Sequence, residues 1–217
     1  MRRVIVSLCD ITGHMTAPWV AAGYEAVLVD PQHGISTSDD TTARLAMTVE
    51  EAIPHLSHLV LAGRVAFVAG FPPCTHLAVS GARWFATKRL ADPMFQAKAV
   101  AVAEQCRTFA TTSGAPWFVE NPVSVLRQVF GKPDHTFDPY EFTLLEPSDN
   151  YTKRTCLWSG GGFRMPPRQM DTTLGAPDSR IHVAPPGPKR ADFRSATPMG
   201  FARAVFAANA KTVEVAA

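Results

Sequence analysis

The stretch VAFVAGFPPC, from Val65 to Cys74, contains an apolar run that leads into two prolines. The run from Val65 to Ala69 has the length and the residue types of a buried β-strand. Pro72 and Pro73 lack backbone N–H groups, so they cannot continue a central strand ladder. We therefore predict that the strand ends before the prolines and that Cys74 follows on a stiff segment, with a loop beginning at Gly81.

Other short apolar runs alternate with helical patterns. Strands are predicted at 4–9, 26–29 and 117–119, and helices at 16–23, 48–63, 92–114 and 197–209. Thr48 and Glu51 have the spacing of a capping box, and Pro54 falls at the first turn of that helix or kinks it. This alternation predicts an α/β fold with a parallel sheet covered by helices on both faces. In such sheets, ligands bind beyond the carboxyl ends of the strands.

Length and composition predict one compact core, because the chain has 217 residues and is 46% hydrophobic. Its apolar stretches are too short for a membrane-spanning helix or a signal peptide, so we expect a cytoplasmic protein without a membrane partner. The four cysteines are widely spaced and form no CxxC pair, which predicts reduced thiols and neither a disulfide framework nor a metal site. No pattern predicts the oligomeric state.

The basic residues are concentrated in the last third of the chain. Residues 1–150 contain 11 Lys and Arg against 15 Asp and Glu, whereas residues 151–217 contain 10 against 4. This asymmetry suits a polyanionic partner, although ordinary solvated Lys and Arg side chains would also account for so small an excess.

Two reactive side chains follow predicted strands. Cys74 comes after the strand at 65–69, and Glu120 comes after the strand at 117–119. A free cysteine is mostly un-ionised at neutral pH, so it needs activation, or a substrate that a nearby acid activates. If the two strands are neighbours, Cys74 and Glu120 form a nucleophile and acid pair at one edge of the sheet.

Several segments resemble the C5-cytosine DNA methyltransferases, most closely their short phage and prophage branch. PPCTHLAVSG resembles the Pro-Cys catalytic loop, VENP the Glu-Asn-Val element, and TKRTCLW the Gln-x-Arg-x-Arg strand. LCDITG resembles the loop that binds S-adenosyl-L-methionine, and RSATPMGFARAV resembles the closing helix. The resemblance implies a Rossmann-like sheet of the S-adenosylmethionine-dependent methyltransferase type, and methyl transfer to C5 of cytosine in DNA.

The resemblance also implies roles for individual residues. Cys74 would add to C6 of cytosine, Glu120 would hold or protonate N3, and Arg154 would contact the base oxygen or a phosphate. The implied cofactor-binding residues are Cys9, Asp10, Thr12, Gly13, Asp30 and Pro72, with Asp30 on the ribose hydroxyls. We expect DNA to be bound by Ser80, Arg83 and Lys153, and by Arg180, Lys189 and Arg190 of the basic segment that follows. The chain departs from the family pattern at Thr75, which replaces a glutamine, and at Cys156, which replaces the second arginine.

The pattern divides the chain into a catalytic and cofactor-binding part at 1–158, a Gly- and Pro-rich basic insertion at 159–193, and a C-terminal helix at 194–217. The insertion is too short for an independent core, so it cannot be a full base-reading domain. We therefore expect low sequence specificity and a preference for single-stranded or distorted DNA. Two alternatives stay open, namely the same chemistry on a free cytosine nucleotide such as dCMP, and a non-catalytic DNA-binding relative.

Overall fold

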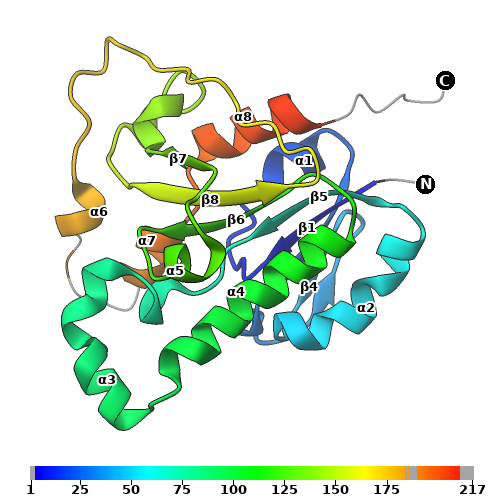
Figure 1. Ribbon diagram of the computed structural model, residues 1–217. Helices are drawn as coiled ribbons and strands as arrows, with labels where there is room; N and C mark the ends of the chain where they lie inside the picture. Colours follow the sequence, from blue (N-terminus) through cyan, green and yellow to red (C-terminus); the bar gives the residue numbers. More distant parts are fainter. Residues whose placement is uncertain (1–2, 184, 186–189, 211–217) are drawn as a thin grey trace.

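The computed structural model describes residues 3–183, 185 and 190–210, and an eight-stranded mixed sheet runs through its centre (Figure 1). The strands are β1 (Val4–Leu8), β2 (Glu25–Val29), β3 (Thr37–Ser38), β4 (Thr42–Leu45), β5 (Val65–Gly70), β6 (Trp117–Pro122), β7 (His135–Phe137) and β8 (Thr155–Gly160). Their order is β3-β4-β2-β1-β5-β6-β8-β7. The α/β class predicted from the sequence is confirmed.

The sheet is not wholly parallel, and this corrects the prediction. β4, β2, β1, β5 and β6 run parallel, whereas β3 is antiparallel to β4, and β8 is antiparallel to both β6 and β7. The parallel part has the order of a Rossmann-like doubly wound sheet, with the topological switch point between β1 and β5. Ligands of such sheets bind at this point, beyond the carboxyl ends of the strands.

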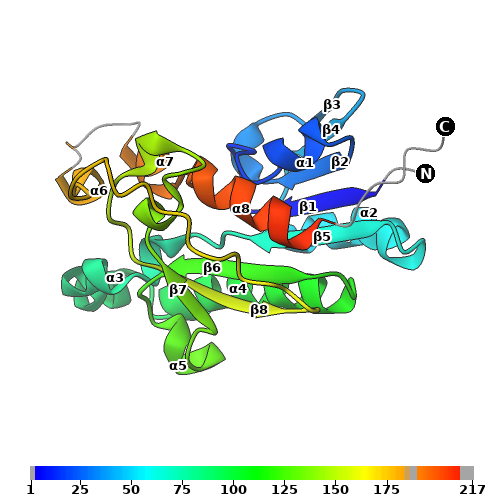
Figure 2. The ribbon, with the colours of Figure 1, turned by 90° about the horizontal axis from the view of Figure 1, so that it is seen from above.

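Helices cover both faces of the sheet, and each face has its own apolar core (Figures 1 and 2). The helices α1 (Ala17–Ala21) and α8 (Met199–Asn209) pack on one face, where Phe67 of β5 and Phe118 of β6 are fully buried. The helices α2 (Val49–Leu61) and α4 (Phe95–Thr112) pack on the other face against Val68 and Val119. Alternate side chains of each strand point to opposite faces, so both faces of the central strands are apolar.

Local sequence signals explain where several elements begin and end. Thr48 and Glu51 form both halves of the predicted capping box of α2, which continues through Pro54. β5 ends at Gly70, directly before the segment with the two prolines, as predicted. The loop predicted at Gly81 is wrong, because Gly81 lies within the 3-10 helix η3 (Val79–Trp84), and the helix α3 (Phe85–Ala91) follows it.

The remaining helices are short. They are α5 (Leu126–Phe130), α6 (Arg180–Val183) and α7 (Arg190–Ser195), together with the 3-10 helices η1 (Pro31–His33), η2 (Cys74–His76), η4 (Pro139–Phe142) and η5 (Pro147–Asp149). No helix in the described part of the chain is long and apolar enough to cross a membrane.

The basic insertion packs against the rest of the protein. Phe163 and Met165 contact the core on the α1 and α8 face, and the Arg164 amide donates to Asn209 Oδ1 of α8 at 2.8 Å. Gly161 has a φ of 61°, and a Cβ there would lie 1.9 Å from the Ala115 carbonyl oxygen, so a glycine is required at this turn. β8 extends to Gly160 and α7 spans 190–195, so both cross the boundaries that the sequence pattern places at 158 and 193.

Candidate active site

The predicted site residues follow the carboxyl ends of neighbouring parallel strands. Leu8 pairs with Val29 of β2 and with Gly70 of β5, and Gly70 pairs with Val119 of β6. The segments that follow these strands therefore lie along one edge of the sheet. Cys9 follows β1, Asp30 follows β2 and Cys74 follows β5. Glu120 does not follow its strand as predicted but lies within β6, which continues to Pro122 through its pairing with β8.

Cys74 and Glu120 lie close enough to interact electrostatically. Cys74 begins η2 and is half-buried, and Glu120 is half-buried on β6. Burial raises the pKa of the Cys74 thiol, the Glu120 carboxylate raises it further, and Lys153 and Arg194 lower it. Burial also raises the pKa of Glu120, and Lys153 opposes that effect. The pair therefore favours a protonated thiol and a protonated carboxyl over two charged groups.

Three hydrogen bonds hold the Cys74 segment against the β6 segment. Asn121 Nδ2 donates to the Pro72 carbonyl oxygen at 2.9 Å, in the buried interior. Beyond the cysteine, the Val79 amide donates to the Val123 carbonyl and the Val125 amide donates to the Leu77 carbonyl, each at 3.0 Å. These bonds lie on both sides of Cys74 along the chain, so Cys74 is held in a defined position relative to Glu120.

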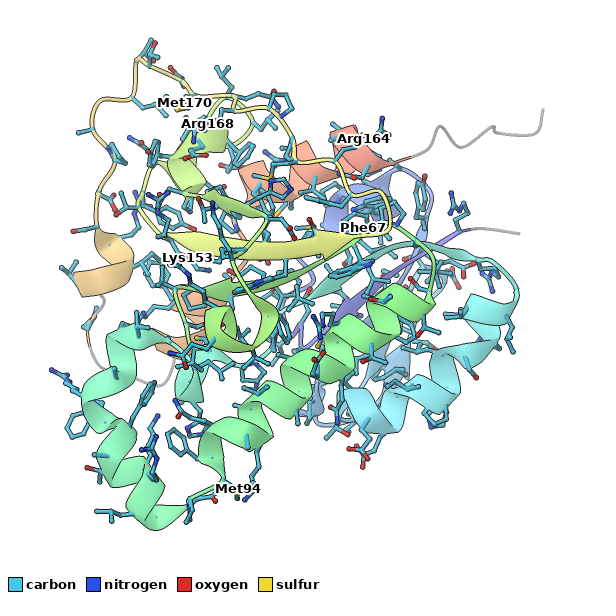
Figure 3. All side chains as sticks on the ribbon, in the orientation of Figure 1. Phe67, Met94, Lys153, Arg164, Arg168 and Met170 are labelled. Atoms are coloured by element: carbon cyan, nitrogen blue, oxygen red, sulfur yellow. The ribbon has the colours of Figure 1, made fainter. Side chains whose placement is uncertain are left out.

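Lys153 and Arg194 are the cations that act on Cys74. Lys153 lies two residues before β8, at the end of the sheet where Thr155 pairs with Pro122 (Figure 3). Its Nζ donates to the Ala196 carbonyl at 3.3 Å. Arg194 was not predicted as a site residue, although it begins the RSATPMGFARAV segment. A cation close to a catalytic segment in space but distant from it in sequence leaves no local signal.

Arg154 is placed differently from Lys153. Its guanidinium is 3.5 Å from Asp138 Oδ2, and the Arg154 side chain is 58% exposed. Burial raises the pKa of Cys156 and of Glu141, and the charge of Arg154 opposes that effect. The contact of Arg154 with the base or a phosphate stays a prediction, and Lys153 is the cation that the structure places beside Cys74 and Glu120.

The loop after β1 is shaped by Asp10. Its Oδ1 accepts the amides of Thr12 and Gly13 at 2.8 and 2.9 Å, and its Oδ2 accepts the Ser7 hydroxyl at 2.7 Å. Cys9 has a φ of 57° and Gly13 a φ of 70°, so both residues adopt the left-handed conformation. Because both carboxylate oxygens are engaged within the loop, Asp10 orders the backbone that a ligand would meet.

Asp30 is free to bind a ligand through one oxygen. The residue is 6% exposed at the end of β2, and its Oδ1 accepts the Gln32 amide at 2.8 Å. Its Oδ2 accepts no hydrogen bond from the residues that the structure describes. A carboxylate oxygen at the switch-point edge fits the hydroxyl groups of a ribose, so the residues present fit a nucleoside cofactor.

The predicted DNA-binding residues are scattered. Ser80 and Arg83 are exposed on η3. Arg180 donates to both carboxylate oxygens of Asp178 and to the Ser148 carbonyl, so its charge is already paired. Arg190 begins α7, and Lys189 lies outside the described residues.

Metal ligands do not gather at this edge. Within residues 3–183, 185 and 190–210, no group of three or more His, Cys, Asp or Glu residues has the arrangement of a metal site.

No protein-family model matches the chain, and no curated protein matches it.

Proposed function

We propose that the protein transfers a methyl group from S-adenosyl-L-methionine to C5 of cytosine in DNA. The observation that carries this proposal is the placement of Cys74, in the segment that follows β5, and of Glu120, on the adjoining strand β6, within electrostatic range of each other. The α/β sheet and the short segments described above are compatible with the C5-cytosine methyltransferase family. The basic last third of the chain favours a polyanionic substrate.

The raised pKa values fit a mechanism in which the acid activates the substrate. Glu120, whose pKa is raised by burial, would in its protonated form donate a hydrogen bond or its proton to N3 of the cytosine and make C6 electrophilic. Cys74 would give its thiol proton to solvent, its Sγ would form a bond to C6, and the C5–C6 π electron pair would shift to C5. After alkylation of C5, a water would take the C5 proton, the C5–C6 double bond would form again, and Cys74 would leave as a thiolate. Return of the N3 proton to Glu120 would then restore the aromatic ring. Lys153 would limit the charge that builds up on the pair.

The cofactor would lie along the edge formed by the loop after β1 and by Asp30. Asp30 would accept hydrogen bonds from the ribose hydroxyls, and the backbone from Cys9 to Gly13, ordered by Asp10, would contact the rest of the molecule. When bound, S-adenosyl-L-methionine would supply an electrophilic methyl group. Pro72 would contribute the stiff wall next to Cys74.

A transfer assay tests the proposal. The protein is incubated with radiolabelled S-adenosyl-L-methionine and with single-stranded DNA, duplex DNA or dCMP. We expect label in DNA for the wild type and none for Cys74→Ala. Cys106→Ala is the matched control, because Cys106 is fully buried in α4 and contacts Cys9 rather than Glu120.

The acceptors separate the proposal from its alternatives. Label in dCMP alone would assign the same chemistry to a free nucleotide. DNA binding without any transfer at saturating cofactor would identify a non-catalytic DNA-binding protein. Methylation confined to one motif of four or more bases would contradict the low specificity that we expect from the short insertion.

A further inference from the structure

The segment from Val79 to Met94, called the arm below, stands out from the body of the protein. It consists of η3, α3 and the turn to α4, and none of the residues of η3 or α3 is buried. Both ribbon views show α3 projecting at the end of the molecule opposite the termini (Figures 1 and 2). Figure 3 shows Met94 at the outer end of the turn that joins α3 to α4.

The arm exposes large apolar side chains. Trp84 is 55% exposed, Leu90 87% and Met94 57%. Because η3 and α3 contribute no buried residue to the core, Trp84 and Leu90 do not serve to pack these helices against the body of the protein. Single exposed apolar side chains also occur elsewhere on the protein, as at Leu61 and Ile35, so the case for a binding surface rests on the charges that accompany Trp84 on the arm.

The charge of the arm identifies the kind of partner. The arm contains three basic residues, Arg83, Lys88 and Arg89, and one acidic residue, Asp92. Asp92 is paired at 2.8 Å with Lys98 of α4, a cation outside the arm, so the three basic residues of the arm are left without an acidic partner within it. Lys88 Nζ donates to the Thr75 carbonyl at 2.7 Å, next to Cys74. The positive charge therefore extends from the arm to the candidate nucleophile, which suits a polyanion.

The aromatic residue decides between kinds of polyanion. The guanidinium of Arg83 lies 5.2 Å from the centre of the Trp84 ring, so the cation and the aromatic ring are presented together. Unpaired nucleic acid is bound by this combination, in which a base stacks on the ring and cations contact the phosphates. The bases of a duplex are stacked on one another, so they offer no face to an indole without unstacking.

We propose that the arm binds an unpaired segment of a polynucleotide, with a base stacked on Trp84 and with Arg83 and Arg89 on its phosphates. The proposal rests on the proposed function in one respect, since it makes single-stranded nucleic acid the substrate that reaches Cys74. The Val79 amide, bonded to the Val123 carbonyl at 3.0 Å, connects the arm to the β6 segment beside Glu120.

Tryptophan fluorescence tests the arm without any catalysis. Trp84 is exposed, whereas Trp19, Trp117 and Trp158 are at most 8% exposed, so a bound base quenches mainly Trp84. Oligothymidylate and a hairpin duplex of equal length are titrated into the protein without cofactor. We expect quenching and tighter binding with oligothymidylate, and a log–log salt slope that becomes less negative by about 0.7 in Arg89→Ala.

Substitutions of Trp84 complete the test, with affinity measured by anisotropy of a labelled oligonucleotide. Trp84→Ala should weaken binding by about tenfold or more, and Trp84→Phe should restore most of the loss. Leu61→Ala is the control. Leu61 is also highly exposed, at 88%, but it ends α2, directly before the turn into the amino end of β5, whereas Cys74 follows the carboxyl end of that strand.

Equal oligonucleotide affinity of Trp84→Ala and wild type would overturn the proposal, and so would tighter binding of the hairpin duplex than of oligothymidylate. A Trp84 fluorescence spectrum that changes with protein concentration alone would also overturn it, because it would indicate that the arm mediates self-association. Trp84-dependent binding without methyl transfer would contradict only the proposed chemistry. Methyl transfer that is independent of Trp84 would contradict only the role of the arm.

Discussion

Asn121 Nδ2 donates a hydrogen bond of 2.9 Å to the carbonyl oxygen of Pro72, and this bond joins the segment that carries Cys74 to the strand that carries Glu120. Asn121 is fully buried, and its Oδ1 has no hydrogen-bond partner among the described residues. The side-chain amide of Asn121 therefore acts through its Nδ2 donor, which fixes the position of the Pro72 segment relative to β6.

We predict that Asn121→Ala reduces the turnover number for methyl transfer more than it changes the cofactor KM. Loss of the donor leaves the Pro72 carbonyl unsatisfied, which should lower the free energy of unfolding by about 1–3 kcal/mol. Ser57→Ala is the matched control, since Ser57 Oγ donates to the Pro54 carbonyl at 2.7 Å on the exposed face of α2. Steady-state kinetics and urea unfolding measure both effects, and equal turnover in the two variants would contradict the positioning role.

We expect DNA containing 5-fluorocytosine to form an adduct with Cys74 that resists denaturation. Fluorine cannot leave C5 as a proton does, so the bond between Cys74 Sγ and C6 is retained. The adduct is detected by denaturing electrophoresis and located by peptide mass spectrometry. It should form in Cys106→Ala and be missing in Cys74→Ala, and its absence from an otherwise active wild type would indicate a non-covalent route.

Asp30→Ala should weaken binding of S-adenosyl-L-methionine by about 1–3 kcal/mol, the cost of a lost charge-assisted hydrogen bond, and leave DNA binding unchanged. Asp39→Ala is a suitable control. Asp39 also accepts an amide two residues ahead, from Thr41 at 2.9 Å, but it lies in the exposed connection before β4. Titration calorimetry measures the affinities, and equal cofactor affinity in wild type and Asp30→Ala would assign ribose binding to another residue.

Glu120 should make the protein less stable as the pH rises. Burial raises the pKa of Glu120 in the folded state, so the folded protein holds this proton more tightly than the unfolded chain. The resulting stability is fully present below the unfolded pKa and is lost as the pH rises through the folded pKa. Glu120→Gln should therefore be more stable than wild type at neutral pH, and equally stable well below the unfolded pKa.

Glu51→Gln provides a control of opposite sign. Hydrogen bonds from Thr48 lower the pKa of Glu51, so its contribution is present above the unfolded pKa and is lost as the pH falls. Urea unfolding across the acid range compares the three proteins. A Glu120→Gln variant that is less stable than wild type at neutral pH would show that the charged carboxylate is stabilised in the fold.

Local sequence patterns predicted the central elements, namely the strands β1, β2, β5 and β6 and the helices α1, α2, α4 and α8, but not the short elements at the edges of the fold, such as β3, β4, β7 and α3. The apolar run before Pro72 predicted the strand that became β5, and Thr48 with Glu51 predicted the start of α2. These signals are readable because strand alternation, missing proline N–H groups and capping bonds act over a few residues. They also placed Cys74 and Glu120 after strands, which was enough to expect a pair if the strands were neighbours.

Only the tertiary structure decided which elements meet. The parallel pairing of β5 with β6 brings Cys74 and Glu120 together, and the antiparallel insertion of β8 beside β6 brings Lys153 to the same edge. The packing of α7 places Arg194 near Cys74, and the salt bridge to Asp138 holds Arg154. Strand order and ion pairing depend on hydrogen bonds and burial between residues far apart in the chain, and a pattern that spans a few residues contains no record of them.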